Sequence, residues 1–224
     1  PALLPDSAQT LARTLAECSV ELKLKPLWSL AERNIAWLAA ADHHVILCCD
    51  DAYPAVLATI PSPPLVLFVH GDLEVLKLPQ FAIVGSRRAT AAARQRAALF
   101  ATHLAERGVA VTSGMALGID AAAHRAALAA HGKTIAVLGC GIDRIYPARH
   151  QQLAKAISEA GARVSEFPLA SAPKPHHFPQ RNRIIAGLSC GTLVVEAAAR
   201  SGSISTAMHA LEQGREVFAM SGRV

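Results

Sequence analysis

Aromatic residues and cysteines are both scarce in this sequence. Aromatics make up 4% of the 224 residues, and the five cysteines include no Cys-x-x-Cys pair. An odd set of cysteines without that spacing suggests neither a disulfide framework nor a zinc site. We therefore expect no metal site and no cofactor, and a reducing, cytoplasmic location.

Long hydrophobic runs are also missing. The longest are Val45–Cys49, Leu65–Val69 and Ile135–Leu138, far below the roughly 18 residues of a membrane helix, and we expect no membrane association. Hydrophobic residues nevertheless make up 52% of the chain, which argues against disorder. The sequence begins at Pro1 without a methionine, has no signal peptide and stops after a strand-like run at Val224, so we expect a piece of a longer protein.

Charge is distributed unevenly along the chain. Residues 1–79 hold 5 Lys and Arg against 9 Asp and Glu, whereas residues 80–224 hold 17 against 8, a net charge of +9. Arginine, whose planar guanidinium suits phosphate, supplies 16 of the 22 cationic residues. The asymmetry favours an anionic partner for the second part of the chain, although a solvated basic face without a partner is the alternative.

The hydrophobic pattern predicts an α/β fold with a doubly wound, mainly parallel sheet. Strand-like runs alternate with alanine-rich helical stretches, which is typical of βαβ units. The predicted strands are Phe81–Val84, Val109–Thr112, Thr134–Leu138, Arg163–Phe167, Thr192–Glu196 and Glu216–Met220. The predicted helices are Ala91–Arg107, Asp120–His131, His150–Ala160 and Ser203–Gln213. Helical periodicity over residues 8–41 predicts a small N-terminal module within residues 1–45, and residues 46–80 form a connecting segment with an added strand before the main domain, residues 81–224.

Ligands of such sheets bind at the carboxyl ends of the strands, where the strand order reverses. The loops expected there are rich in glycine and serine, so that an anion can approach backbone N–H groups at helix N-termini. Their candidate residues are Gly85, Ser86, Arg87 and Arg88, then Ser113 and Gly114, then Gly139, and finally Ser201, Gly202 and Ser203. The alternative role of these glycines and serines is tight turning and helix capping, and both roles can hold together. No loop matches Gly-x-Gly-x-x-Gly or the P-loop pattern.

Taken in order, these loops resemble the DprA/Smf family of bacterial DNA-processing proteins. The resemblance covers residues 81–224 and extends more weakly upstream. It rests on many blocks in one order: Ala82–Arg87, Ser113–Asp120, Thr134–Gly139, Gly141–Asp143, Tyr146–Pro147, Phe178–Ser189, Val194–Ala197, Ser201–Ser203 and Gly214–Ala219.

The resemblance implies a protein that binds single-stranded DNA without sequence preference during natural transformation. It implies that the protein protects incoming DNA, recruits the recombinase RecA and forms a homodimer. The implied fold is an extended Rossmann-like domain, preceded here by the small N-terminal helical module. Family members often add a C-terminal winged helix, which nothing in this chain represents.

Arg87 is the first candidate DNA contact. It follows a predicted strand end, so we expect its guanidinium to meet a phosphate that the Gly85 and Ser86 amides also contact. Arg88 is a weaker copy of the same arrangement. A surface arginine paired with a neighbouring helix is the alternative.

The second candidate cluster surrounds Phe178. This ring could stack on a nucleobase, or it could be a core anchor between prolines. Lys174 lies upstream, and Arg181, Asn182 and Arg183 follow. Positions i and i+2 diverge on a helix, so the two arginines cannot both face one phosphate, and the sequence does not say which contacts DNA.

The competing interpretation is an enzyme. Gly191–Glu196 resembles the Gly-Thr…Glu block of Rossmann-like nucleoside monophosphate phosphoribohydrolases, in which a glutamate faces the ribose. Glu166 and Glu196 both end predicted strands in the crevice. We expect them to fix loops by accepting hydrogen bonds from arginines or amides rather than to catalyse a reaction.

Overall fold

The computed structural model describes residues 25–198 and 201–220. The chain forms two compact units, residues 1–36 and residues 37–224. The described part of the first unit is residues 25–36, which belong to helix α2 (Lys25–Trp37). Residues 8–24 of the predicted N-terminal helical stretch lie outside the described residues, and residues 38–41, also predicted as helical, form turns. No helix among the described residues is long and hydrophobic enough to cross a membrane.

The second unit is built on one eight-stranded sheet with the order β1-β2-β6-β5-β4-β3-β7-β8. The strands from β3 to β8 pair in parallel, whereas β2 runs antiparallel to both β6 and β1. The strands are β1 (His43–Leu47), β2 (Val66–Gly71), β3 (Gln80–Gly85), β4 (Ala110–Ser113), β5 (Thr134–Val137), β6 (Ala162–Ser165), β7 (Gly191–Val195) and β8 (Glu216–Ala219).

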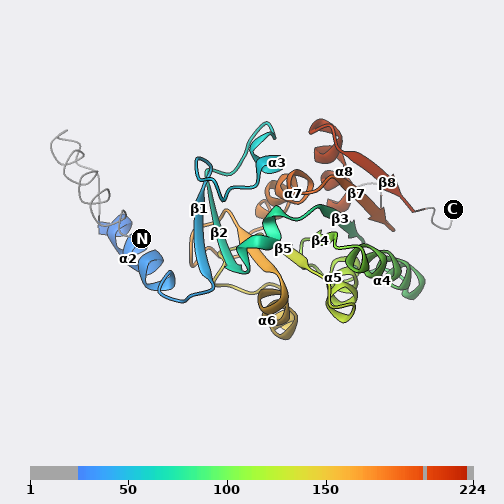
Figure 1. Ribbon diagram of the computed structural model, residues 1–224, viewed down its shortest axis with the longest axis horizontal. Coiled ribbons are helices and arrows are strands. Elements are labelled where there is room, and N and C mark those ends of the chain that lie inside the picture. Colours follow the sequence, from blue (N-terminus) through green and yellow to red (C-terminus); the bar gives the residue numbers. More distant parts are fainter. Residues whose placement is uncertain (1–24, 199–200, 221–224) are drawn as a thin grey trace. The chain divides into compact units, whose positions relative to one another are not determined.

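Helices cover both faces of this sheet (Figure 1). One face packs against α4 (Ala91–Glu106), α5 (Ile119–Ala129) and α6 (Gln151–Ala160), and the other against α3 (Ala55–Ala58), α7 (His177–Leu188) and α8 (Gly202–Glu212). Two short 3-10 helices, η1 (Leu73–Lys77) and η2 (Ala148–His150), complete the connections. Helix α4 buries alanines at every fourth position, namely Ala93, Ala97, Ala101 and Ala105, because small side chains on one helical face allow close packing against α5 and the sheet.

The predicted α/β class and Rossmann-like sheet are confirmed. Parallel strands buried on both faces read as continuous hydrophobic runs, which is why the sequence located them. Helix α7 is absent from the predicted helices, because its first turns hold His177, Pro179 and Arg181 instead of an alanine-rich pattern.

The strand order reverses between β3 and β7. From β3 the chain adds β4, β5 and β6 on one side, and then crosses to add β7 and β8 on the other. The two strands approach closely at their carboxyl ends, where a Cβ atom on Gly85 would lie 2.0 Å from the carbonyl oxygen of Val195. Gly85 is therefore required by strand packing, and this edge is where a Rossmann-like sheet binds ligands.

Candidate functional site

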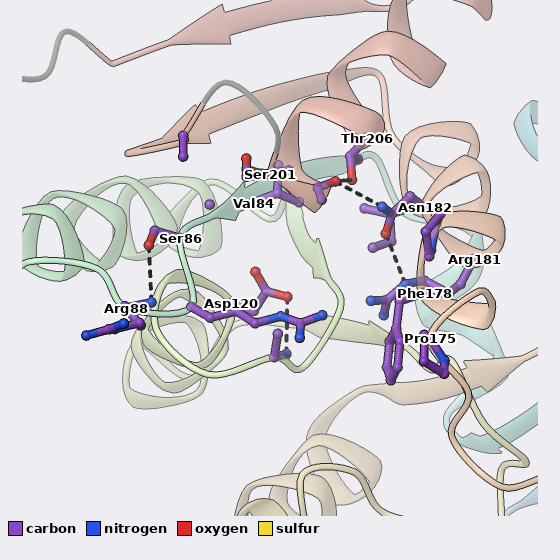
Figure 2. Close-up of a pocket in the computed structure, with 18 of the residues that line it drawn as sticks. Val84, Ser86, Arg88, Asp120, Pro175, Phe178, Arg181, Asn182, Ser201 and Thr206 are labelled. Atoms are coloured by element: carbon purple, nitrogen blue, oxygen red, sulfur yellow. Dashed lines mark hydrogen bonds between the residues drawn. The ribbon is translucent and has the colours of Figure 1, made fainter.

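A cleft of about 600 Å³ lies at this edge of the sheet. Figure 2 shows Ser86 and Arg88 on one side of it and Phe178, Arg181 and Asn182 on the other. Ten of the fifteen residues predicted from the sequence line the cleft: Gly85, Ser86, Arg87, Arg88, Phe178, Arg181, Asn182, Ser201, Gly202 and Ser203.

The loop after β3 is held by backbone hydrogen bonds. The Ser86 N–H donates to the Glu196 carbonyl oxygen at 2.8 Å, and the Ser86 carbonyl accepts from the Ile119 N–H at 3.2 Å. The Ser86 hydroxyl accepts from the Arg88 N–H at 3.1 Å. The Ser86 amide, which the sequence suggested for a phosphate, is thus already bonded. The side chains of Arg87 and Arg88 remain exposed at the rim.

Arg87 faces an aromatic wall. Its guanidinium carbon lies 5.4 Å from the centre of the Phe178 ring, a cation–π distance. The Tyr146 ring, from the loop after β5, lies 5.5 Å from the Phe178 ring, centre to centre. A Cβ atom on Gly139 would lie 2.8 Å from Cδ1 of Phe178, so Gly139 makes room for the ring. The structure therefore gives Gly139 a packing role beneath the cleft wall.

Arg181 reaches the cleft but is almost fully buried, with 4% of its surface exposed. Its Nη1 donates to the Gly114 carbonyl oxygen at 2.9 Å and also to the Val137 carbonyl oxygen. Burial lowers the pKa of Arg181 to about 10, although the nearby Asp120 carboxylate opposes this, so the guanidinium stays charged at neutral pH. Arg181 therefore ties together the carboxyl ends of β4 and β5.

Asp120 is the buried counterpart of Arg181. Its Oδ2 accepts hydrogen bonds from the Gly114 and Ala116 N–H groups at 3.2 and 3.1 Å. Burial raises the pKa of Asp120, while Arg181 and these amides work in the opposite direction. A Cβ atom on Gly114 would lie 2.5 Å from Nη1 of Arg181. Glycine at position 114 thus leaves room for the guanidinium.

The far wall of the cleft is the N-terminus of α8. The Asn182 side-chain amide donates to the Gly202 carbonyl oxygen at 3.0 Å, which fixes this helix against α7. The Ser201 and Ser203 hydroxyls lie 2.7 Å apart, and no side chain caps the helix. No atom would lie within 4 Å of a Cβ atom on Gly202. The side of the helix start at Gly202 is therefore open, although the Ile204 N–H already donates to the Ser201 carbonyl oxygen at 3.1 Å, and helix N-termini attract anions.

The other predicted residues lie away from the cleft lining. The buried Ser113 hydroxyl donates to the Ile83 carbonyl oxygen at 2.6 Å. Arg183 projects from α7 to Glu166 and forms two hydrogen bonds with its carboxylate, at 2.9 and 2.6 Å. This pair is mostly buried, with Arg183 17% exposed. Lys174 is exposed before α7, and Gly114 and Gly139 pack beneath the site.

Tyr146 is a cleft residue that sequence reasoning did not single out as a contact. It was visible only as part of a Tyr-Pro block. The signal that could have found it is the rarity of aromatics, since the sequence holds only two tyrosines.

Glu196, at the end of β7, holds the start of α4. Its carboxylate accepts from the Thr90 N–H at 3.0 and 3.2 Å and from the Thr90 hydroxyl at 2.5 Å. Thr90 is the N-cap of α4, so a protein carboxylate already occupies this helix N-terminus. Glu196 has a φ of 53°, a left-handed backbone that few non-glycine residues adopt. Glu166 and Glu196 both lie outside the cleft lining, and they accept hydrogen bonds from an arginine and from a loop respectively, as expected.

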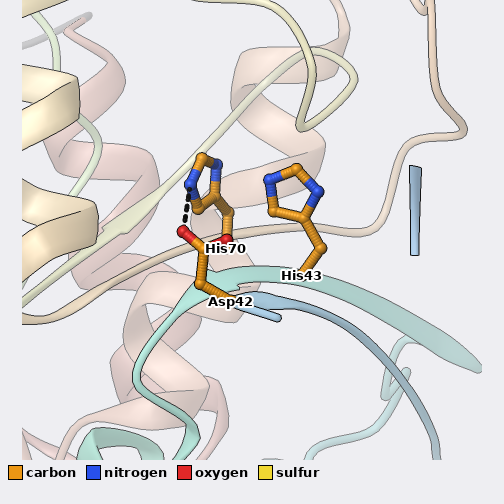
Figure 3. Close-up of side chains that lie close together, drawn as sticks. All are labelled: Asp42, His43 and His70. Carbon is orange, nitrogen blue, oxygen red and sulfur yellow. Dashed lines mark ion pairs between the residues drawn. The ribbon is translucent and has the colours of Figure 1, made fainter. Parts of the chain in front are cut away.

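A second cluster, outside the cleft, brings together Asp42, His43 and His70 (Figure 3). Their ligand atoms lie within 4.8 Å of one another, which suits a metal ion on distance alone. However, Arg163 donates to Nδ1 of His70. The imidazole proton of His70 must then be on Nε2, and this nitrogen lies 2.9 Å from the Asp42 carboxylate. Both His70 nitrogens are thus engaged, and the contacts form a chain from Arg163 on β6 through His70 on β2 to Asp42, the residue before β1.

Comparisons with known proteins agree with this architecture. Residues 44–224 match the family described as DNA recombination-mediator protein A. The chain is 50% identical to protein Smf of Escherichia coli over 194 residues, covering 86% of this chain and 52% of that protein. It is 44% identical to DNA processing protein DprA of Streptococcus pneumoniae over 175 residues, 78% of this chain and 62% of that one. The chain thus spans about half to three fifths of these relatives.

Solved structures give the same result. The crystal structure of DprA from S. pneumoniae matches with a TM-score of 0.78 and 42% identity, over 82% of this chain and 65% of that one. A structure of DNA processing protein A from Helicobacter pylori is described as showing a single-stranded DNA binding mode. It matches with a TM-score of 0.75 and 30% identity, and the match covers 81% of this chain and 82% of that one. The chain therefore belongs to the DNA recombination-mediator protein A family, which the DprA and Smf proteins represent.

Proposed function

We propose that this chain binds single-stranded DNA without sequence preference, in the cytoplasm, through the cleft at the β3–β7 switch point. The observation that carries the proposal is the exposed guanidinium of Arg87 opposite the Phe178 ring. Binding that tolerates any sequence combines cations that contact phosphates with rings on which bases stack. The relative from H. pylori, whose structure is described as showing a single-stranded DNA binding mode, supports the same ligand class.

The phosphate contacts come from the two sides of the cleft. Arg87 and Arg88 are exposed at the rim, and neither pairs with a carboxylate among the described residues. The opposite side is the N-terminus of α8, where Ser201, Gly202 and Ser203 line the cleft and no side chain caps the helix. Such contacts position a strand without reading its sequence. The net charge of +9 over residues 80–224 adds long-range attraction.

The experiment compares single-stranded and double-stranded oligonucleotides with equal numbers of phosphates in a gel-shift assay. We expect tighter binding to the single strand and a steep loss of affinity with salt, because counterions are released when arginines neutralise phosphates. Equal affinity for both forms would contradict the proposal, since it would leave only non-specific attraction to charge.

We further propose that the complete protein protects incoming DNA and loads RecA during natural transformation. This extends to the chain what its family membership suggests. The test is RecA filament assembly on DNA coated with single-strand binding protein, with and without the protein. Unchanged assembly would count against RecA loading.

A homodimer is part of the same proposal. No strand among the described residues pairs with the outer edge of β8, and its neighbourhood exposes large hydrophobic side chains: Met208, Leu211 and Phe218. Such patches mark interaction surfaces. Light scattering at several concentrations should give twice the chain mass, whereas the chain mass at every concentration would exclude the dimer.

The enzyme alternative depends on Glu196. Its carboxylate is committed to three hydrogen bonds with Thr90, which supports a structural role. Incubation with AMP should release no adenine. Turnover that Glu196→Gln abolishes would favour the phosphoribohydrolase alternative instead.

A further inference from the structure

Three exposed cations, here called the outer rim, lie beside the cleft but outside its lining: Arg144, Arg149 and Lys174. The two arginines flank Tyr146 in the sequence, and the lysine directly precedes Pro175; both Tyr146 and Pro175 line the cleft. Figure 2 shows Pro175 beside Phe178, across the cleft from Arg88. The outer rim therefore adjoins the cleft on the side opposite the loop after β3.

Two segments carry the outer rim: residues 138–150 and 168–176. Hydrogen bonds join these segments. The Gly141 N–H donates to the Ser171 carbonyl oxygen at 3.0 Å, and the Ala170 N–H donates to the two carboxylate oxygens of Asp143 at 2.9 and 3.0 Å. Asp143 is the only acidic residue in either segment, and its carboxylate is engaged in this contact. The outer rim is therefore one connected surface with an excess of positive charge.

The outer-rim side chains differ from other exposed cations in having no partner. None of the three forms an ion pair or a side-chain hydrogen bond within the part of the chain that the structure describes. Exposed lysines elsewhere are paired: Lys77 with Glu74, Lys133 with Asp72 and Lys155 with Glu159. Clustered like charges repel one another, and an anionic ligand would offset this repulsion.

We propose that the outer rim binds the DNA strand where it continues beyond the cleft, with Arg144 and Arg149 each contacting a phosphate. This inference rests on the proposed function and extends it, because the outer rim then sets how many nucleotides contribute to affinity. Proteins that bind single strands follow the backbone with a line of positive charge. Helix α6 begins directly after this segment, and the positive end of its dipole adds to the attraction.

The position of the outer rim favours nucleic acid over an acidic protein partner. The Arg87 guanidinium carbon lies 5.4 Å from the centre of the Phe178 ring, which lies 5.5 Å from that of Tyr146. A strand whose phosphate contacts Arg87 therefore passes these rings and reaches the segment that carries Arg144 and Arg149. Protein interfaces instead have hydrophobic cores, and Tyr146 is the only exposed large hydrophobic side chain on the two segments.

The experiment measures how affinity depends on strand length. Oligo-dT strands of about 4 to 16 nucleotides span the site sizes of single-strand-binding folds, and fluorescence anisotropy gives the affinity for each. At about 0.15 M salt, charges more than about 8 Å apart are largely screened, so direct contacts dominate. We expect the double variant Arg144→Gln/Arg149→Gln to bind the longest strand about 2- to 30-fold more weakly than the parent protein. It should bind the shortest strand like the parent protein, because the cleft alone holds that strand.

The salt dependence should change in the same way. On the longest strand, the slope of affinity against salt should become shallower by about 1.4, since each lost contact with a single strand removes about 0.7. On the shortest strand the slope should not change. The variant Arg144→Lys/Arg149→Lys keeps both charges and should retain the parent's gain of affinity with length.

The matched control removes two positive charges from the opposite edge of the sheet. Arg107 follows the last residue of α4, and Lys133 precedes the first residue of β5, so both lie near the amino ends of the parallel strands. Arg107→Gln/Lys133→Gln should bind strands of every length like the parent protein. An equal loss in this control would show that only net charge matters and would overturn the role of the outer rim.

The remaining outcomes separate this inference from the proposed function. Parent protein that binds no strand would overturn both. Parent protein that binds, together with an Arg144→Gln/Arg149→Gln variant that matches it at every length, would overturn the outer rim alone and favour an acidic protein partner. A loss that is equal at all lengths would also overturn it, because the two arginines would then act within the cleft. A loss confined to long strands would establish the path beyond the cleft.

Discussion

Two pairs of arginines stand close to the same cleft and differ in what their guanidinium groups contact. Arg87 and Arg88 are exposed on the loop after β3. Arg181 and Arg183, on α7, are engaged by backbone carbonyls and by Glu166 respectively. An arginine in a basic motif can thus either hold the fold together through hydrogen bonds within the protein or contact a ligand. The difference predicts that the α7 pair controls stability, whereas the rim pair controls binding.

The largest expected effect is on Arg181. Arg181→Ala leaves the buried carbonyl oxygens of Gly114 and Val137 without the donor that the guanidinium supplies. Each buried polar group left unsatisfied costs about 1–3 kcal/mol, so the free energy of unfolding in urea should fall by about 2–6 kcal/mol. A loss of DNA affinity with unchanged stability would reverse the assignment and make Arg181 a direct contact.

Gly114→Ala tests the same clamp from the opposite side. The new Cβ atom would meet the Arg181 guanidinium at 2.5 Å, and the cost of such overpacking is about 1–3 kcal/mol. The penalty should shrink in an Arg181→Ala background, because the obstructing group is gone. Equal penalties in both backgrounds, measured by a double-mutant cycle of urea unfolding, would show that Gly114 does not act through Arg181.

Arg87→Ala should change binding and leave folding alone. We expect weaker binding to oligo-dT and a salt slope that is shallower by about one unit, with unfolding free energy within about 0.5 kcal/mol of the parent protein. Arg183→Ala is the matched control, because its guanidinium is held by Glu166 and lies outside the cleft lining. A steeper loss of affinity for Arg183→Ala than for Arg87→Ala would break the comparison.

The smallest expected effect concerns His70, which accepts a hydrogen bond from a further buried arginine, Arg163. Burial and then the charges of Arg163 and His43 lower the pKa of His70 from 6.5 to about 4, although Asp42 opposes the shift. His70 therefore binds a proton more readily in the unfolded chain than in the folded one. Its contribution to the free energy of unfolding is fully present above pH 6.5 and is lost as the pH falls towards 4. His70→Gln should make this loss shallower, whereas His103→Gln, at an exposed position on α4, should not. Identical pH profiles for parent and His70→Gln would contradict the pairing.

The fold was largely predictable from the sequence. Buried parallel strands such as β5 and β7 are short hydrophobic runs, and the alanines of α4 repeat at helical spacing. The place of β1 and β2 was not predictable, because a hydrophobic run such as Leu65–Val69 does not indicate which strand it will pair with. The pairing of β2 with β6, which places β1 at the edge of the sheet, depends on packing over a long sequence separation.

The site was predictable in position but only partly in residue roles. The switch-point rule located the loops after β3 and at the start of α8. Arg181 and Arg183 could not be told apart, because which side of α7 faces the sheet depends on tertiary packing. The pairing of Tyr146 with Phe178 was equally hidden, since these residues come from different loops and elements.

The interlocked ends of β3 and β7 have a consequence for synthesis. Thr90 and Glu196, which join these ends, are 106 positions apart in the chain. A nascent polypeptide leaving the ribosome therefore carries its rim arginines long before the opposite wall of the cleft exists, and contacts of such long range form late. The basic loop after β3 is thus synthesised well before the cleft is complete, and the cleft can bind nucleic acid only after α8 has been translated.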